Sequence, residues 1–364
     1  MDTTTTAQDP VQQRDADGRQ IFRRPPPRKD WLAQTTEPVI EPDLPIVDPH
    51  HHLWTDDGGY LLEDLLADTE SGHRIVATVF MQSHWGYHPD GPEAMQPVGE
   101  IARVAAVAQD VERRKLTTKV CAGIVGFANM ELGDAVAPVL QAQIEAGAGR
   151  FRGIRHATVR DDRITNNPAR LLPFDMLRDT RFRRGLAQLQ AAGLSFDAWL
   201  YHAQIAQLTE VARALPGLPI VLNHIGGPLG AGPYAAIRAE VFKDWRDAMK
   251  DLASCPNVHV KVGGMAMVVF GFDFHKRALP PSSQQLADAW RPYVETCIEL
   301  FGPQRCMFQS NFPVDKGSCS YLVLWNAFKR ITEGASPDEK MALFNGTASR
   351  VYRLDVFTAT RTPH

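Results

Sequence analysis

Residues 46–54, IVDPHHHLW, join a short β-branched apolar run to three consecutive histidines. The run is too short for a helix and predicts a strand that ends at the histidines. Because side chains alternate along a strand, His50 and His52 point to one side and His51 points to the other. The fold then depends on how many other runs of this kind the sequence contains.

Seven more short apolar runs follow, and stretches with helical periodicity separate them. The predicted strands span residues 45–50, 75–82, 120–127, 151–158, 194–201, 219–225, 258–264 and 306–313. The predicted helices include residues 93–115, 134–147, 203–215, 235–253, 284–301 and 320–333. Eight parallel strands, each followed by a helix, close naturally into a barrel, whereas open doubly wound sheets usually have about five to seven strands. The sequence therefore predicts an α/β protein with a (β/α)8 barrel of the TIM type.

The regions outside the predicted strands suggest how the chain is organised. Residues 1–44 are polar, and the prolines of FRRPPPRKDW (22–31) bar both a helix and ladder pairing, so we expect an extended N-terminal arm. The arm would wrap its own domain or a neighbour. We expect a single barrel domain at residues 45–354 and a C-terminal tail at residues 355–364. Residues 265–285 exceed a normal connection and contain alternating phenylalanines, which predicts an ordered apolar lid.

The overall composition is that of an ordinary globular protein. Hydrophobic residues make up 44% and charged residues 22%, which argues against disorder or a fibrous repeat. A net charge of −3 offers no basic field for nucleic acid or an anionic membrane, so we expect a small-molecule substrate. The five cysteines form no CxxC pair, and no apolar run is long enough to span a membrane. We therefore expect a cytoplasmic protein without a disulfide framework or a thiolate zinc site.

Polar residues gather where the predicted strands end. In a (β/α)8 barrel those carboxyl ends share one face, and the active site forms there. A single histidine at such a place is more often a hydrogen-bonded core or surface residue than a ligand. His50 and His52 on one side of the first strand, together with His224 from the sixth, are a different case, because imidazoles from separate strand ends would meet in one pocket. Such a set suits zinc, iron and manganese, so these residues predict a divalent metal site.

Other residues near the strand ends are candidates for binding a substrate. Arg155, on the fourth strand, is either a salt-bridge partner at the barrel rim or a bidentate clamp for a substrate carboxylate. Trp54 is either a wall of the pocket or a core residue. His84, after the second strand, is a further candidate for substrate binding, although a structural role is the commoner one for a single histidine.

Four segments, taken in order, carry a resemblance to a known family. They are IVDPHHHLW (46–54), FRGIRH (151–156), PIVLNHIGGP (219–228) and CMFQSNFPVD (306–315). With them, residues 45–354 resemble the amidohydrolase superfamily, specifically the amidohydrolase-related branch that includes sugar-acid and dicarboxylate lactonases. The resemblance implies a distorted (β/α)8 barrel that holds one or two divalent metals, or occasionally none, and hydrolyses lactones, esters or amides. It matches His50 and His52 to the first-strand metal pair, His224 to the sixth-strand ligand and His202 to a further ligand position.

The sequence departs from the family pattern at the eighth strand. The family pattern FGSDFP has an aspartate as metal ligand and general base, whereas this sequence reads FQSNFP, with Asn311 at that position. A neutral amide cannot accept a proton from water near pH 7, although its oxygen can bind a metal or orient a substrate hydroxyl. Either Asp315 or a histidine such as His156 or His202 would then take the proton, or the chemistry does not need a base.

These features lead to three hypotheses about function. The first is a metal-dependent hydrolase, with zinc as the expected metal, acting on a lactone, ester or amide of a small carboxylate-bearing molecule. The second keeps the barrel but is a non-heme iron oxygenase with one or two iron ions. The third is a catalytically silent subunit that partners an active paralogue through the N-terminal arm. We expect the chain to form a homo-oligomer, or a hetero-oligomer with a paralogue.

Overall fold

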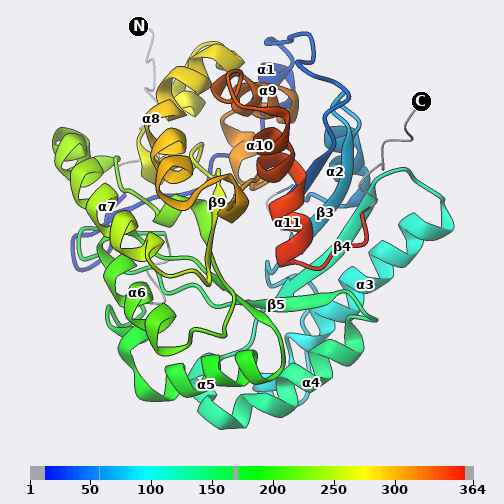
Figure 1. Ribbon diagram of the computed structural model, residues 1–364, viewed down its shortest axis with the longest axis vertical. Coiled ribbons are helices and arrows are strands. Elements are labelled where there is room, and N and C mark those ends of the chain that lie inside the picture. The colour runs from blue at the N-terminus through cyan, green and yellow to red at the C-terminus, as the bar shows by residue number, and fades with distance from the viewer. Residues whose placement is uncertain (1–12, 57, 167–170, 357–364) are drawn as a thin grey trace, which may run out of the picture.

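Eight parallel strands form the barrel and follow one another in chain order within one sheet (Figure 1). The computed structural model describes residues 13–56, 58–166 and 171–356. The strands are β2 (Ile46–His51), β3 (Ile75–Met81), β4 (Lys119–Gly126), β5 (Phe151–Arg155), β7 (Ser195–Ala198), β8 (Ile220–Leu222), β9 (Val258–Val262) and β10 (Cys306–Phe308). The segment after β10 closes the barrel on β2, because Asn311 N donates to His50 O at 2.9 Å and His52 N donates to Phe312 O at 2.8 Å. The predicted (β/α)8 barrel is confirmed, and each predicted strand overlaps an observed one.

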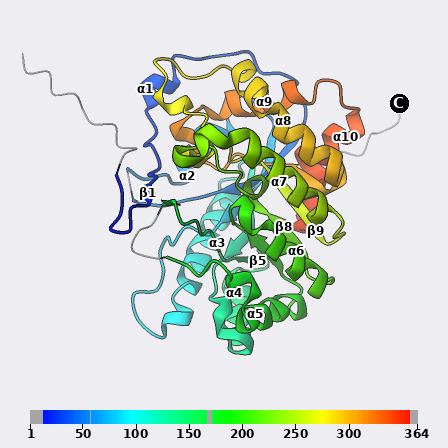
Figure 2. The same cartoon turned by 90° about the vertical axis from the view of Figure 1, so that its left-hand side faces the viewer.

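Helices surround the barrel, as Figures 1 and 2 show. Those that follow the strands are α2 (Leu62–Thr69), α3 (Val98–Arg113), α4 (Ala137–Ala146), α5 (Thr180–Ala191), α6 (Ile205–Ala214), α7 (Arg238–Ala253), α8 (Ser283–Phe301) and α9 (Tyr321–Ile331). Their apolar faces turn inward; α8, for example, buries Leu286, Trp290 and Val294 at a spacing of four residues. The predicted set omitted α2, which is short, and α5, whose sequence TRFRRGLAQLQA is mostly polar.

The inside of the barrel changes from apolar to polar along its axis. Near the amino ends of the strands it is filled by apolar side chains, to which Tyr352 and Leu354 contribute after α11 (Thr347–Val351). Toward the carboxyl ends, buried side chains such as Asp197 and Lys261 are charged. The apolar side chains therefore fill one end of the barrel, the buried charged side chains lie above them, and the site lies next to the charged side chains.

The N-terminal arm lies on its own barrel in the part that the structure describes. β1 (Gln20–Ile21) pairs in parallel with β6 (Ile164–Thr165), and the Trp31 indole donates to the carbonyl of Ala278 at 3.0 Å. Figure 2 shows β1 and α1 (Lys29–Leu32) on the same side of the molecule. The prediction of an arm without helix was wrong at this one turn, because α1 begins after the run of three prolines, where backbone N–H donors are again available.

The segment after β9, residues 265–285, does not form the predicted lid. Phe274 is 1% exposed and packs edge-on against Trp290 of α8, with ring centres 6.3 Å apart. Phe272 stacks on Phe274 at 5.8 Å. These rings therefore belong to the packing under α8, and within this fully described segment Met267 is the residue that lines the cavity.

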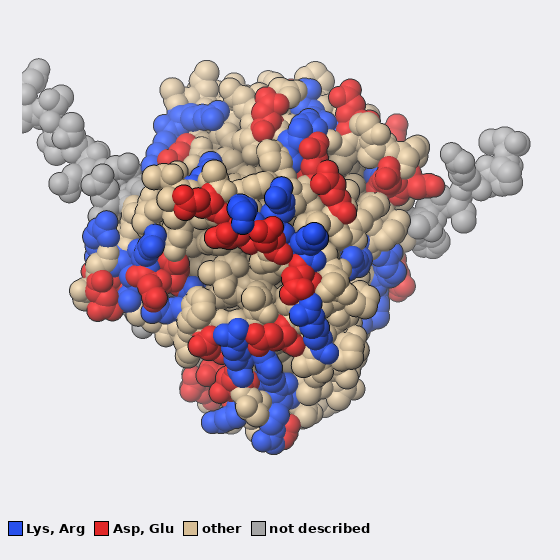
Figure 3. Space-filling model, turned by 60° about the vertical axis from the view of Figure 1, so that its left-hand side comes forward, with Lys and Arg blue, Asp and Glu red and all other residues tan. Residues whose placement is uncertain are grey.

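Charged side chains of both signs are mixed on one face of the molecule (Figure 3). Figure 3 shows Lys and Arg beside Asp and Glu on the face in view, without one continuous region of either sign. All five cysteines are buried free thiols, as expected for a chain without a disulfide framework. Among the described residues, no helix combines the length and the apolarity needed to cross a bilayer.

Candidate active site

A cavity of about 460 Å³ lies at the carboxyl ends of the barrel strands. Of the residues that the sequence analysis proposed for the site, those that line it are His52, Trp54, His84, Arg155, His156, His224 and Asn311. His50 contacts two of these rings from below, whereas His202 and Asp315 are not part of the lining. The cavity therefore lies at the strand ends, as predicted, and the contacts of each residue decide what it does there.

Three imidazoles meet at the bottom of the cavity. The ring centre of His50 lies 5.0 Å from that of His52 and 4.6 Å from that of His224. Burial is the main reason that the pKa of each ring lies well below its ordinary value, so the rings are neutral at pH 7. His52 Nδ1 lies 2.9 Å from the carbonyl oxygen of Met81, which only accepts. Nδ1 of His52 therefore carries the hydrogen, and Nε2 carries the lone pair.

His50 lies between two cationic side chains. Its Nε2 is 3.4 Å from Nη1 of Arg155, and its Nδ1 is 3.5 Å from Nζ of Lys261. Guanidinium and ammonium groups donate hydrogen bonds and do not accept them, whereas a neutral imidazole accepts at one nitrogen only. The lone pair of His50 therefore faces one of these donors, and the other donor faces the ring N–H.

The ammonium group of Lys261 belongs to a buried network below the cavity. It has no exposed surface and donates to Oδ1 of Asp197 at 2.8 Å. The Asn223 amide and the Tyr352 hydroxyl donate to the same oxygen at 3.0 and 2.8 Å. Burial lowers the pKa of Lys261 to about 8 and that of Arg155 to about 10, while the charge of Asp197 opposes both shifts. Both cations are therefore mainly protonated at pH 7.

Arg155 connects this network to the cavity. Its Nη2 donates to the carbonyl oxygen of Gln82 at 2.7 Å, and its Nε has no hydrogen-bond partner among the described residues. The rim salt bridge that the sequence left open for Arg155 is absent from the described contacts, so no carboxylate in direct contact neutralises its guanidinium. We call Arg155, His50, Lys261 and Asp197, which come from β5, β2, β9 and β7, the floor of the cavity.

Lys261 and Asp197 were missing from the predicted site. Lys261 stands between two valines in VHVKVGG (258–264), and Asp197 stands within LSFDAWLY (194–201). A charged residue in the middle of an apolar strand must find a buried partner, and this was the available signal. The sequence did not reveal that the two residues are partners, because β7 and β9 are not adjacent.

The residues around the imidazoles do not fit a divalent metal. Among the described residues, no three His, Cys, Asp or Glu side chains are arranged to hold one. An ion on His50 would lie about 2 Å from a ring nitrogen, in the space that the donors of Arg155 and Lys261 already approach. Two unit charges about 4 Å apart repel by about 4 kcal/mol near a protein surface, and a dication doubles that figure. The rings of His50, His52 and His224 meet as predicted, but this donor set does not form the predicted centre for zinc, iron or manganese.

Two predicted residues lie away from the cavity. The ring of His202 faces Tyr234 at 6.0 Å and does not line the cavity, so the structure does not bring His202 into contact with the imidazole cluster. Asp315 lies behind Asn311: its oxygens accept from the Asn311 amide at 2.8 Å and from a backbone N–H at 3.2 Å. Burial raises the pKa of Asp315 to about 8. Asp315 therefore holds the Asn311 amide and does not reach a water in the cavity.

Aromatic residues form much of the cavity wall. His156 packs against Phe127 and Phe182, with ring centres 5.1 Å from each. Trp54 stacks on His52 at 5.7 Å, with 27° between the ring planes. The packing gives His156 apolar neighbours and favours a role in shaping the wall over the predicted role as base. Trp54 is both a wall residue and a support for the His52 ring.

The mouth of the cavity is formed by the arm and by loops. We call Arg24, Trp54, Arg160 and Asp161 the rim, since each lines the cavity and lies outside the strands. The Arg24 guanidinium lies over the Trp54 ring, 4.0 Å from its centre. Arg160 pairs with the exposed Asp162 at 2.8 Å.

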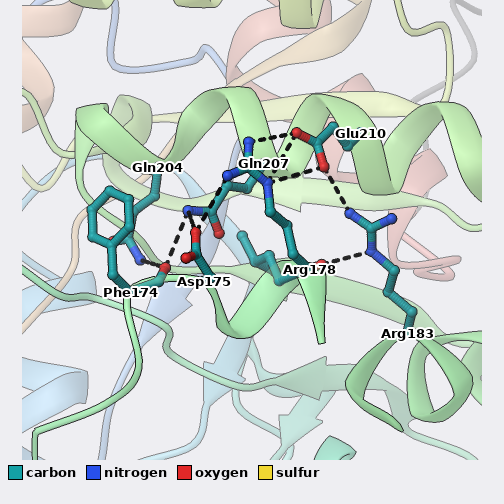
Figure 4. A network of polar contacts seen from close by, with 8 residues as sticks. Phe174, Asp175, Arg178, Arg183, Gln204, Gln207 and Glu210 are labelled. Atoms are coloured by element: carbon teal, nitrogen blue, oxygen red, sulfur yellow. Dashed lines mark hydrogen bonds and ion pairs between the residues drawn. The ribbon is translucent and has the colours of Figure 1, made fainter. Parts of the chain in front are cut away.

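The loop between the rim and α5 is tied to α6 and the residues before it. The carbonyl of Phe174 accepts from the amides of Gln204 and Gln207 at 3.2 and 3.1 Å. Arg178 pairs with Glu210 at 2.7 Å, and Figure 4 shows these contacts together. They fix the end of the loop that brings Leu171 and Leu172 to the cavity.

A polar cavity at the carboxyl ends of a (β/α)8 barrel is the arrangement found in barrel enzymes. The chain belongs to the amidohydrolase family, whose model matches residues 47–354, and the predicted resemblance is confirmed. It is similar to the uncharacterized protein y4mH of Sinorhizobium fredii, with 33% identity over 340 residues that cover 86% of this chain and 99% of that protein.

Two further likenesses concern function and fold. An L-fucono-1,5-lactonase of Burkholderia multivorans is 29% identical over 286 residues, which cover 72% of this chain and 86% of the lactonase. A crystal structure of an amidohydrolase from Burkholderia multivorans, with bound zinc, superposes with a TM-score of 0.62 at 22% identity, covering 85% of this chain and 99% of that one. The first likeness supports a hydrolytic enzyme, and the second shows the same barrel fold.

Proposed function

We propose that the protein hydrolyses the ring ester of a lactone derived from a small carboxylate-bearing molecule, and that it does so without a metal. The observation that carries the proposal is the position of Arg155, which lines the cavity, touches His50 and has an Nε without a partner among the described residues. The likeness to L-fucono-1,5-lactonases supports the choice of a lactone over an ester or an amide.

The charge of the cavity favours an anionic substrate. Its described lining contains three arginines, Arg24, Arg155 and Arg160, and one acidic residue, Asp161. The Asp161 carboxylate already accepts hydrogen bonds from the Tyr234 hydroxyl and from two backbone N–H groups. The volume of about 460 Å³ is that of a small-molecule site. A carboxylate on the substrate would therefore complement the cavity.

The geometry supports a reaction in which His52 acts as the base. Its Nε2 accepts a proton from water, and the water oxygen attacks the lactone carbonyl. Arg155 donates to the carbonyl oxygen as negative charge develops there. The ring C–O bond then breaks, and protonated His52 returns the proton to the departing oxygen, which yields an open-chain hydroxy acid. His52 thus takes the role for which the sequence suggested Asp315 or His156, while Asn311, held by Asp315, offers its amide to a substrate hydroxyl.

The proposal is tested with a panel of lactones under matched conditions. The panel contains an L-fucono-1,5-lactone, five-membered aldonolactones, lactones that carry a carboxylate, and an open-chain ester and amide of the same acids. We expect the highest kcat/KM for a carboxylate-bearing lactone, with the same rate under nitrogen. Absence of turnover on every lactone would contradict the proposal and favour the silent-subunit hypothesis, and oxygen consumption by an iron-containing chain would favour the oxygenase.

A further inference from the structure

We propose that Lys261 supplies, from inside the barrel, the positive charge that a divalent metal would supply at His50, and that it thereby keeps such a metal out of the cavity. The inference rests on the proposed hydrolysis for its catalytic part only. Lys261 acts through His50 and is therefore a positioning residue.

Lys261 lies inside the barrel, close to Asp197, His50 and Tyr352. Its Nζ lies 2.8 Å from Oδ1 of Asp197, 3.5 Å from Nδ1 of His50 and 4.9 Å from the ring centre of Tyr352. Both members of the Lys261–Asp197 pair have fully buried side chains. His50 in turn contacts Arg155, which lines the cavity. One imidazole therefore separates the buried ammonium from the group proposed to bind the reacting oxygen.

Burying the Lys261–Asp197 ion pair costs free energy. Taking two charges out of water costs several kcal/mol per ion, and well-packed apolar residues often serve stability as well as a buried ion pair. Packing alone therefore gives no reason for a lysine and an aspartate at these positions. Asp197 also receives hydrogen bonds from Asn223 and Tyr352, so the carboxylate that holds the ammonium in place is itself fixed.

The two positive charges beside His50 oppose the binding of a metal ion. An ion on the imidazole cluster would face the ammonium of Lys261 as well as the guanidinium of Arg155. If the ammonium is removed, the cluster loses one of these repulsions, and the Asp197 carboxylate loses its cation. Oδ2 of Asp197 has no hydrogen-bond partner among the described residues, so this oxygen would become available as a ligand to the metal.

Calorimetric titration with zinc chloride alone tests the exclusion of metal independently of turnover. We expect the wild-type cavity to bind zinc weakly and Lys261→Met to bind it about 100-fold more tightly. The gain should disappear in Lys261→Met/His224→Gln, which distinguishes the cavity from surface sites. If Lys261→Met does not fold, Asp197→Asn/Lys261→Met removes both charges and should still gain about tenfold in affinity. Tight zinc binding by the wild type that His224→Gln abolishes, or no gain in the folded variants, would overturn the proposal.

Kinetics on the best lactone test the positioning role. We expect Asp197→Asn/Lys261→Met to lower kcat about 100-fold with KM within about threefold, because the ground-state complex does not touch Lys261. Adding these changes to His50→Gln should cause no further loss, since Lys261 acts through His50.

A second buried ion pair provides the control. Lys316 and Asp68 pair at 2.6 Å with side chains 12% exposed, outside the cavity lining. Asp68→Asn/Lys316→Met should leave kcat within about twofold of the wild type. Losses that add fully to those of His50→Gln, or equal losses in the control, would overturn the positioning role. If the wild type hydrolyses no lactone, the proposed function fails while the zinc titration still decides the exclusion of metal.

Discussion

The floor and the rim of the cavity are built in different ways. The floor side chains come from four barrel strands and contact one another, from Asp197 through Lys261 and His50 to Arg155, at distances of 2.8 to 3.5 Å. The rim side chains come from the arm and the loops; Arg24 lies over the Trp54 ring, and Arg160 pairs with the exposed Asp162. Strand geometry fixes the floor, whereas loop paths fix the rim. We infer that the floor determines the reaction and the rim determines which substrates enter.

Charge also behaves differently in the two regions. In the floor, the fully buried Lys261 ammonium pairs with Asp197, and the charges of Asp197 and Glu100 both act on Arg155. At the rim, Arg160 pairs with an exposed partner, so solvent and salt weaken the interaction. Changes in the floor should therefore cost several times more free energy than changes at the rim.

The largest effect is expected for Arg155→Met. The substitution removes the donor proposed for the developing oxyanion, so kcat/KM on the best lactone should fall about 1,000-fold. Steady-state kinetics measure the change, and a thermal melt confirms that the variant folds. Arg150→Met, which breaks an ion pair with Glu112 just before the same strand, is the control and should stay within about twofold. A loss of kcat/KM below about tenfold for Arg155→Met would mean that Arg155 does not stabilise the developing oxyanion.

The second largest effect is expected for the free energy of unfolding and concerns Glu100, whose charge acts on Arg155 of the floor. Glu100, at 0% exposure, accepts from the backbone N–H groups of Ser83 and Trp85, and burial raises its pKa from 4.5 to about 7. Below pH 4.5 the carboxyl group is protonated in both states; as the pH rises to 7 the unfolded chain ionises first, so the free energy of unfolding falls by about 3 kcal/mol.

Glu100→Gln keeps the accepting oxygen and removes this ionisation. Its stability relative to the wild type should therefore increase by about 2.5 kcal/mol between pH 5 and pH 8, as measured by urea unfolding at both values. Glu93→Gln, at an exposed position that precedes the same helix, is the control and should show no such trend. A difference between Glu100→Gln and the wild type that does not change with pH would contradict the raised pKa.

The smallest effect is expected at the rim, for Arg24→Ala. KM for a carboxylate-bearing lactone should rise about fivefold with kcat nearly unchanged, and KM for a neutral lactone should change little. Arg28→Ala is the matched control, because Arg28 stacks on Trp31 at 4.1 Å elsewhere on the arm. Equal changes for both lactones, or a large fall in kcat, would mean that the rim does more than select substrates.

The same contrast explains what the sequence could predict. Strand periodicity found all eight barrel strands, and alternation correctly placed His50 and His52 on one side, because both properties are local. The strand-end argument brought Arg155 and His224 to the cavity for the same reason. The pairing of Lys261 with Asp197 joins residues 64 positions apart, and no local pattern encodes it.

Local patterns also misled where tertiary contacts decided the outcome. The phenylalanines of residues 265–285 suggested a lid but are covered by α8. Asp315 was a plausible base from its distance along the chain to Asn311, yet its oxygens turn to the Asn311 amide and to a backbone N–H. The histidines suggested a metal site. The two cations that lie against His50 come from other strands, so the sequence around the histidines does not reveal them.

In the proposed reaction, the fixed cations of the floor, Arg155 and Lys261, take the place of a metal. The most direct measurement is kcat/KM on the best lactone, together with metal content by elemental analysis, for wild-type protein before and after exhaustive treatment with a chelator. We expect the rate to stay within about twofold while the metal content falls to trace level. A rate that falls with the metal content and returns when zinc is added back would contradict the proposed reaction.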